Sequence, residues 1–255
     1  MSSKKEREKR REERLQEEAK AQGQDRRRQL IWVGGAAVAV AAVAVLILIV
    51  ASGGGGSGGD ASNLEDVGLV EEQLEGIPQK GLVLGEPSAK VKLIEFGDLQ
   101  CPICKEYSEQ VIPEIVSGPV RTGEAKIEFR NFTIISQQSV PAGAAAIAAG
   151  EQGRGWNYIE LFYRNQGKEG SGYVTDEFMT SIAKGAKVPK IAKWDEERKS
   201  KRIVKEVKGT TSEASNRWEF NGTPSFVVTG PGGTESLGTP GSVEAIEEGI
   251  KSVAG

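Results

Sequence analysis

The stretch "DLQCPICKE", residues 98–106, holds both cysteines of a 255-residue chain, Cys101 and Cys104. It follows "VKLIEFG" (91–97), a run of β-branched and aromatic residues that is typical of a buried strand. Proline is favoured at the first position of a helix, where its missing N–H costs nothing. We therefore expect a helix to begin at Pro102, directly after Cys101.

This placement predicts different environments for the two sulfurs. Free backbone N–H groups and the positive end of the helix dipole stabilise a thiolate, so the pKa of Cys101 should be lowered. Cys104 lies one turn further on and begins an apolar stripe that continues with Tyr107, Val111 and Ile115. The pattern predicts an accessible, reactive Cys101 with a shielded Cys104 behind it, which is the arrangement that thiol–disulfide exchange needs.

Three other roles compete for this pair. A structural disulfide that closes so small a loop restrains the unfolded chain by only about 2 kcal/mol. A zinc site needs four ligands, and the chain has no histidine and no third cysteine. Two inert core thiols are disfavoured because Cys101 stands at a probable helix start, before Pro102. The preferred interpretation is a redox-active disulfide between Cys101 and Cys104, with no metal and no cofactor. The lack of histidine also excludes Ser-His-Asp and Cys-His nucleophiles.

Glu95 is a candidate proton carrier for the pair. It shares a strand face with Val91 and Leu93, just before the predicted helix. Burial in an apolar strand raises the pKa of a carboxyl, so Glu95 could take the proton that Cys104 must lose to resolve a mixed disulfide. The alternative is that Glu95 lies at a strand edge and reaches water.

A third motif is "NGTPSFVV", residues 221–228. A proline that enters a β-branched run gives up a ladder hydrogen bond. A cis bond between Thr223 and Pro224 would explain it, and would leave the Thr223 backbone free to pair with an extended substrate. A trans proline that starts an edge strand fits the pattern equally well.

The amino-terminal part differs from the rest in charge and hydropathy. Residues 1–29 carry 11 Lys and Arg against 7 Asp and Glu, whereas the remaining chain carries 22 against 29, which argues against nucleic acid as a partner. Residues 30–51 are 22 uncharged residues, enough for one transmembrane helix. Arg26 to Arg28 precede them, so the positive-inside rule predicts a single-pass signal-anchor with a cytoplasmic amino terminus. Whether this anchor is ever cleaved stays open.

The sequence of residues 52–255 predicts a linker followed by one folded domain. Residues 52–80 are interpreted as a Gly-rich flexible linker and lead-in, and residues 81–255 as the domain. Strands are expected over "KGLVLG" (80–85), "VKLIEFGD" (91–98) and "KIEFRNFTII" (126–135), then a helical insert over about 138–218. A hairpin from "PSFVVTG" (224–230) and "TESLG" (234–238) and a last helix over 242–254 follow. The order predicts an α/β sheet with a helical insert.

Three motifs in this order resemble the DsbA-like branch of the thioredoxin superfamily. They are "EFGDLQCPICKEY", "AAIAAGEQGRGWNYIELF" and "NGTPSFVV". The resemblance implies a thioredoxin fold with a helical domain inserted between the third and fourth core strands. It also implies Cys101 as nucleophile, Cys104 as resolving thiol, Glu95 as buried carboxylate and Pro224 as a cis-proline. Well-known members carry histidine before the second cysteine, where this chain has Ile103, so we expect a higher Cys101 pKa and a less oxidising couple.

These observations predict a membrane-tethered, extracytoplasmic thiol–disulfide oxidoreductase acting on reduced or misoxidised secreted or membrane proteins. The resemblance suggests a quinone-linked membrane oxidase as its redox partner. A reductase or isomerase would use the same residues, because direction depends on potential and partner. A non-catalytic peptide-binding module is the alternative from another class, and under it the cysteines would be dispensable.

Overall fold

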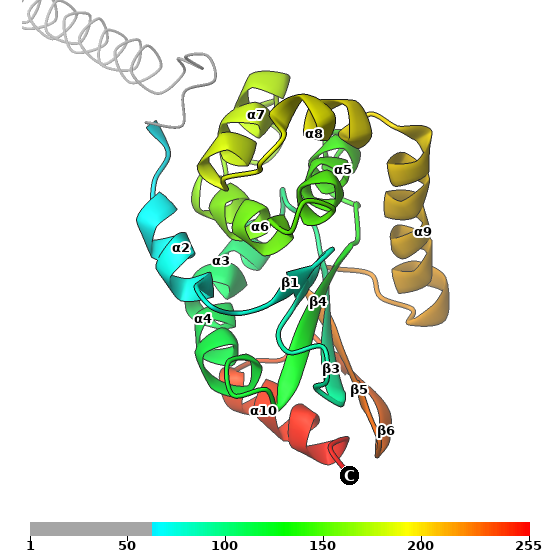
Figure 1. The fold of residues 1–255 in the computed structure, drawn as a ribbon. Helices are drawn as coiled ribbons and strands as arrows, with labels where there is room; N and C mark the ends of the chain where they lie inside the picture. The colour runs from blue at the N-terminus through cyan, green and yellow to red at the C-terminus, as the bar shows by residue number, and fades with distance from the viewer. Residues whose placement is uncertain (1–62) are drawn as a thin grey trace, which may run out of the picture. The chain divides into compact units, whose positions relative to one another are not determined.

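The structure is a computed structural model that describes residues 63–255 (Figure 1). The predicted charged tail, the predicted anchor at residues 30–51 and the Gly-rich part of the predicted linker lie outside the described residues. Within residues 63–255, no helix has the length and apolar character needed to cross a bilayer.

A six-stranded sheet runs through the described part, with the strand order β1-β2-β4-β3-β5-β6. β3 and β4 are parallel and are joined through helices, as the predicted strand–helix–strand unit requires, while the other neighbouring pairs are antiparallel. The strands are β1 (Gln79–Lys80), β2 (Val83–Leu84), β3 (Val91–Gly97), β4 (Ala125–Asn131), β5 (Ser225–Gly230) and β6 (Gly233–Gly238).

The helices fall into two groups. Five of them lie between β4 and β5, where the sequence predicts the insert, and four of these five gather at one end of the sheet while α9 runs alongside it (Figure 1). The insert helices are α5 (Ser139–Gly150), α6 (Gly155–Arg164), α7 (Asp176–Gly185), α8 (Ile191–Arg198) and α9 (Lys201–Arg217). The others are α2 (Val67–Leu74), α3 (Pro102–Gln110), α4 (Ile112–Ile115), the π-helical turn η2 (Val116–Val120) and α10 (Val243–Ser252).

Both faces of β3 are buried, because helices cover the sheet on each side. Leu93 belongs to the main core that includes residues of α4, α6 and α10. Ile94 and Phe96 point to the opposite face and pack in a smaller cluster with Ala214 of α9. This double burial is why β3 is apolar at nearly every position, as strands between two helical layers generally are.

The folded part begins before Gly81, where the sequence placed its start, because α2 and β1 precede that residue. Helix α2 buries Val70 and Leu74, which are one turn apart and lie on one helix face. Just before α2, the Asp66 carboxylate pairs with Arg164 of α6 at 3.2 Å. The packing and this ion pair hold the segment against the insert.

Two predicted strands are shorter than expected. The stretch 80–85 is divided by a turn at Gly81, whose φ is +61°, into β1 and β2. The stretch 126–135 leaves the sheet after Asn131. The backbone N–H groups of Ile134 and Ile135 both donate to the side-chain carboxylate of Asp98, at 2.9 and 3.0 Å. A distant acceptor therefore replaces the ladder partner that a continued strand would need.

Candidate active site

Cys101 is the N-cap residue of α3, and Pro102 occupies the first turn, as predicted. The Cys101 backbone is extended, with φ −75° and ψ 121°, and its N–H donates to the carbonyl of Asp98 at 2.9 Å. The Cys101 Sγ accepts a hydrogen bond from the backbone N–H of Cys104 at 3.4 Å. Sulfur thus takes the capping position that Ser or Asp oxygens usually fill, beside the free N–H groups of the first turn.

The predicted accessibility of Cys101 is wrong in this structure. Cys101 is 4% exposed and Cys104 is 0% exposed, and both are free thiols. The Cys101 thiol donates to the carbonyl oxygen of Thr223 at 3.4 Å, so the loop before β5 covers it. Ile103, between the two cysteines, is 46% exposed. The exposed surface next to the Cys101 sulfur is therefore that of Ile103, while the sulfur itself is covered by the Thr223 carbonyl.

The two thiols differ in acidity. A hydrogen bond from the Cys104 thiol is the largest cause that lowers the pKa of Cys101. Together with the interaction of the Thr223 side chain and the hydrogen bonds from the backbone N–H groups of Cys104 and Ile103, it outweighs burial, giving a pKa of about 6. Burial raises the pKa of Cys104 well above its usual range, and the hydrogen bond that it donates to Cys101 raises it further. At neutral pH the arrangement therefore favours Cys101 as the thiolate and Cys104 as the thiol.

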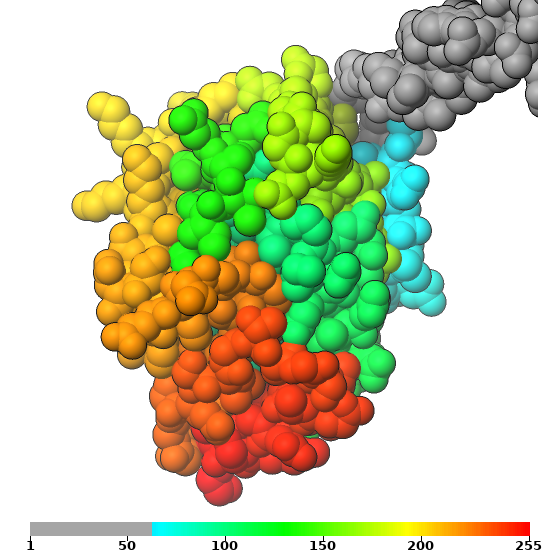
Figure 2. Space-filling view, turned by 180° about the vertical axis from the view of Figure 1, so that it is seen from behind, coloured from blue at the N-terminus to red at the C-terminus, as the bar shows by residue number. Residues whose placement is uncertain are grey.

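The Thr223–Pro224 peptide bond is cis, as the resemblance implied. The Thr223 carbonyl oxygen lies 3.4 Å from the Cys101 sulfur, so the "NGTPSFVV" and "DLQCPICKE" motifs form one site. In the space-filling view, the segment that contains α3 adjoins the orange segment that leads into β5 (Figure 2).

Glu95 lies inside the sheet, and the strand-edge alternative is wrong. It stands opposite Phe129 of β4 and Phe226 of β5, and it is 2% exposed. Its Oε1 has no hydrogen-bond partner. Burial raises its pKa to about 8, with further contributions from Glu160 and from Cys101. A buried carboxyl with a free oxygen and a pKa near neutrality can both give and take a proton.

Asp98 is a structural residue of the site that sequence reasoning missed. It is fully buried, and its Oδ1 accepts the N–H of Gln100 at 2.9 Å while its Oδ2 accepts those of Ile134 and Ile135. One carboxylate thus shapes the turn before Cys101 and ties it to the end of β4. The sequence feature that could have identified Asp98 is its position as an acidic residue directly after a buried strand.

Asp98→Asn is expected to lower the free energy of unfolding by about 1–3 kcal/mol, because the amide replaces one acceptor by a donor and leaves buried N–H groups unsatisfied. Urea denaturation measures the effect. Glu86→Gln is the control, since that side chain is exposed and lies in a turn between strands, and a change within about 0.5 kcal/mol is expected there. Equal small losses for both variants would contradict the assigned role of Asp98.

Gln166 is a second residue that the sequence did not indicate. It follows α6, and its Nε2 donates to the carbonyl oxygens of Leu99 at 2.8 Å and Cys101 at 3.2 Å. The amide therefore fastens the helical insert to the cysteine loop. No local pattern marks it, because its partners lie more than sixty residues away.

Within residues 63–255, no three Cys, Asp or Glu side chains lie close enough together to hold a metal ion. The chemistry that the described site offers is that of two sulfurs, one of them acidic, with a buried carboxyl nearby.

Residues 78–250 match the family described as thioredoxin. The chain belongs to the thioredoxin family. The probable disulfide bond formation protein D of Bacillus cereus is 31% identical over 153 residues, which cover 58% of this chain and 69% of that protein. These matches make the chain a DsbA-like thiol–disulfide oxidoreductase of the thioredoxin family, as the motifs suggested.

Solved structures show the same fold. BdbD from Bacillus subtilis, in its oxidised form, superposes with a TM-score of 0.60 at 23% identity, covering 69% of this chain and 95% of that one. The α-DsbA1 protein of Wolbachia pipientis gives a TM-score of 0.53 at 18% identity and covers 71% and 92%. The predicted DsbA-like thioredoxin fold is therefore confirmed for the described part of this oxidoreductase.

Proposed function

We propose that this oxidoreductase forms or exchanges disulfides in secreted or membrane proteins, outside the cytoplasm, through Cys101 and Cys104. The observation that carries the proposal is the Cys101 sulfur at the N-cap of α3, with the Cys104 N–H at 3.4 Å and the Thr223 carbonyl at the same distance. The Cys104 N–H and the positive end of α3 stabilise this sulfur as a thiolate, which is both the attacking and the leaving form in exchange, whereas the Thr223 carbonyl accepts a hydrogen bond only from the protonated thiol.

In the oxidising direction, a substrate thiolate attacks the Cys101 sulfur of the Cys101–Cys104 disulfide. The Cys104 sulfur leaves with the electron pair of the broken bond and takes a proton, for which Glu95 is the proposed donor. A second substrate thiolate then attacks the mixed disulfide, and the substrate disulfide forms as Cys101 leaves as a thiolate. Two electrons pass from substrate to enzyme, and the reverse sequence describes a reductase.

The Cys101 thiolate is expected to titrate with a midpoint at about pH 6, and its alkylation rate should rise with pH through that value because only the thiolate reacts. Thiolate absorbance near about 240 nm follows the titration. The midpoint should lie higher in Cys104→Ala than in Cys104→Ser, since the Ser hydroxyl still donates to Cys101. A midpoint of about 3.5, or one of about 8.5 as for a free thiol, would refute the expected titration of Cys101.

The direction of transfer depends on the reduction potential of the couple. Known couples run from about −120 mV for a strong oxidase to about −270 mV for thioredoxin. Equilibration with glutathione measures this potential. The purified protein should then oxidise a reduced unfolded substrate faster than it reduces insulin if it is an oxidase, and the opposite order would indicate the reductase or isomerase.

The proposed location follows from the sequence pattern before residue 52. An uncharged run at residues 30–51 after Arg26 to Arg28 supports a single-pass anchor with the catalytic domain outside. A tether of this kind would keep the domain near a membrane-bound redox partner, which we propose to be a quinone-linked oxidase. Protease added to intact protoplasts should digest the domain. Protection of the domain until lysis would place it in the cytoplasm and reject this part of the proposal.

A further inference from the structure

A second carboxyl is buried against the cysteine helix. Glu160 lies on α6, in the insert, and is 1% exposed. Its Oε2 accepts a hydrogen bond from the Ser108 hydroxyl at 2.9 Å. Ser108 stands one turn along α3 from Cys104, and both side chains lie on the buried face of that helix. The Glu160 side chain therefore extends from the insert to the buried face of α3, which also carries Cys104.

Glu95 and Glu160 are both buried in the interior between the sheet, α3 and α6, at 2% and 1% exposure. After burial, Glu160 is the next largest cause that raises the pKa of Glu95. Two carboxyls in one apolar region oppose each other's ionisation, so a proton held by one favours the charged form of the other. The free Oε1 of Glu95 is consistent with a carboxyl that exchanges its proton during the reaction.

Few other charged groups face this pair. Burial raises the pKa of Glu160 to about 7, and the charge of Glu109 on α3 adds to the rise. The hydrogen bond from Ser108 and the charge of Arg164 on α6 lower this pKa but do not offset burial. On the side of Glu95 lie the two cysteines, Tyr163 and the fully buried Asp98. Among the neighbouring elements, α5, β2 and β5 carry no charged residue, and the charged residues of α2, α4, α7, α10, β1 and β4 are exposed or partly exposed.

We propose that Glu160 is a positioning residue of the redox centre, which acts through Glu95 to control the release of the Cys104 proton. The inference rests on the proposed exchange function. In the resolving step, Cys104 passes its proton to the Glu95 carboxylate, and the Cys104 thiolate attacks the Cys101 sulfur of a mixed disulfide. The Cys101–Cys104 bond forms, and the partner sulfur leaves as a thiolate that water protonates. Ionised Glu160 disfavours the Glu95 carboxylate that must accept this proton.

The resolving step can be isolated with oxidised glutathione as the probe. The reduced full chain in mild detergent is mixed with saturating oxidised glutathione, quenched with an alkylating agent and analysed by mass spectrometry. Conversion of the glutathionylated protein to the internal disulfide then reports the attack by Cys104 alone. Its rate is measured from about pH 5 to about pH 10 in wild type, Glu160→Gln, Ser108→Ala, Glu95→Gln and the double glutamine variant.

The acidic limb of the rate profile is expected to move to lower pH by roughly one unit in Glu160→Gln, because removal of a like charge makes Glu95 easier to ionise. Ser108→Ala should shift the limb in the same direction by less, since Glu160 loses a hydrogen bond to its charged form. Glu95→Gln should abolish the limb. In the double variant Glu160→Gln should add nothing, because it acts only through Glu95.

A uniform loss of rate at every pH, with an unchanged midpoint, would show that Glu160 has only a structural role. If Glu160→Gln does not fold, carbon-13 titration of the glutamate carboxyls in wild type decides the matter, because coupled sites give a two-step curve for Glu95 and independent sites give one step. If Glu160→Gln carries out normal exchange with an unshifted rate profile, the role proposed for Glu160 is refuted but the exchange function is not. Failure of wild type to form the glutathione mixed disulfide refutes the exchange function itself.

Discussion

Cys101→Ser is expected to abolish thiol–disulfide exchange, with a loss on the order of 10³-fold or more in the rate of substrate oxidation. The hydroxyl keeps the N-cap position on α3 and can still accept the Cys104 N–H, so the fold should be preserved. It cannot form or break an S–S bond. The other cysteine of the described chain, Cys104, is fully buried and is not placed to attack a substrate. A reduced-substrate refolding assay measures the loss.

Cys104→Ala is the complementary variant. It retains the attacking sulfur but removes the resolving one, so mixed disulfides between Cys101 and substrate proteins should accumulate and disappear on reduction. The double variant Cys101→Ser/Cys104→Ala should trap nothing and is the control for non-specific adducts. Unchanged function in Cys101→Ser, together with no trapped species in Cys104→Ala, would support the non-catalytic binding module instead.

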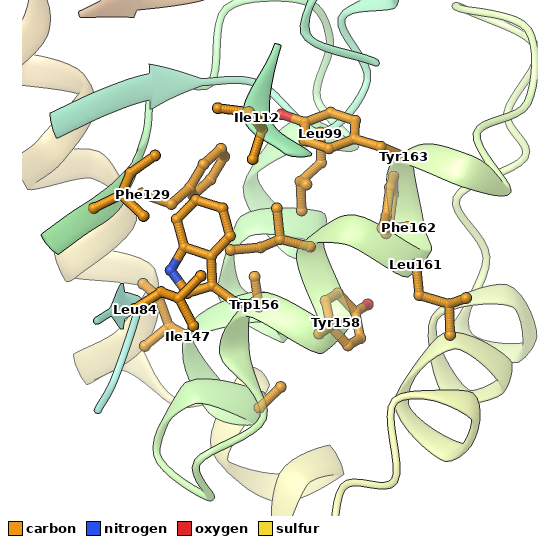
Figure 3. Close-up of a cluster of buried hydrophobic side chains, with 14 of the residues drawn as sticks. Leu84, Leu99, Ile112, Phe129, Ile147, Trp156, Tyr158, Leu161, Phe162 and Tyr163 are labelled. Carbon is orange, nitrogen blue, oxygen red and sulfur yellow. The ribbon is translucent and has the colours of Figure 1, made fainter. Parts of the chain in front are cut away.

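Trp156→Ala is expected to lower the free energy of unfolding by about 3–5 kcal/mol. The indole is fully buried at the start of α6, where it lies near Leu84 and Ile147 (Figure 3). Its Nε1 donates to the carbonyl oxygen of Leu82 at 2.9 Å, which joins the insert to the turn between β1 and β2. The substitution opens a cavity and leaves that carbonyl without its donor. Domains of this size have a free energy of unfolding of only about 5–15 kcal/mol, so the substitution would remove a large part of it.

Urea denaturation followed by far-ultraviolet circular dichroism measures this change without relying on the fluorescence of the removed residue. Trp156→Phe is the matched control, because it keeps most of the ring volume and removes only the hydrogen bond. We expect its loss to be well under half of that in Trp156→Ala. A loss below about 1 kcal/mol in Trp156→Ala would show that the insert does not depend on this contact.

The local features of the site were predictable because their causes act within a few residues. Pro102 starts α3 through its own fixed backbone geometry, and this places Cys101 at the N-cap. The apolar run of β3 identifies a strand, and Glu95 within it identifies a buried carboxyl. The roles assigned to these side chains in catalysis stay predictions until the variants are measured.

The failures share one physical cause, which is a partner far away in sequence. Cys101 is covered by a carbonyl 122 residues later, so nothing near "CPIC" reveals its burial. The strand predicted through Ile135 ends early because Asp98 supplies the acceptor. The lead-in is helical because α6 offers α2 a surface for Val70 and Leu74.

The sequence by itself determined the chemistry of this oxidoreductase: one pair of thiols, a helix that begins between them and an acidic residue in the preceding strand. Such properties depend on residue type and on short-range backbone preference, which are present before the chain folds. Only the tertiary structure decided which groups meet around the cysteine helix: Thr223 at the Cys101 sulfur, Gln166 at the Cys101 carbonyl and Glu160 at Ser108. Desolvation and charge interaction depend on distance in space, and packing alone sets that distance.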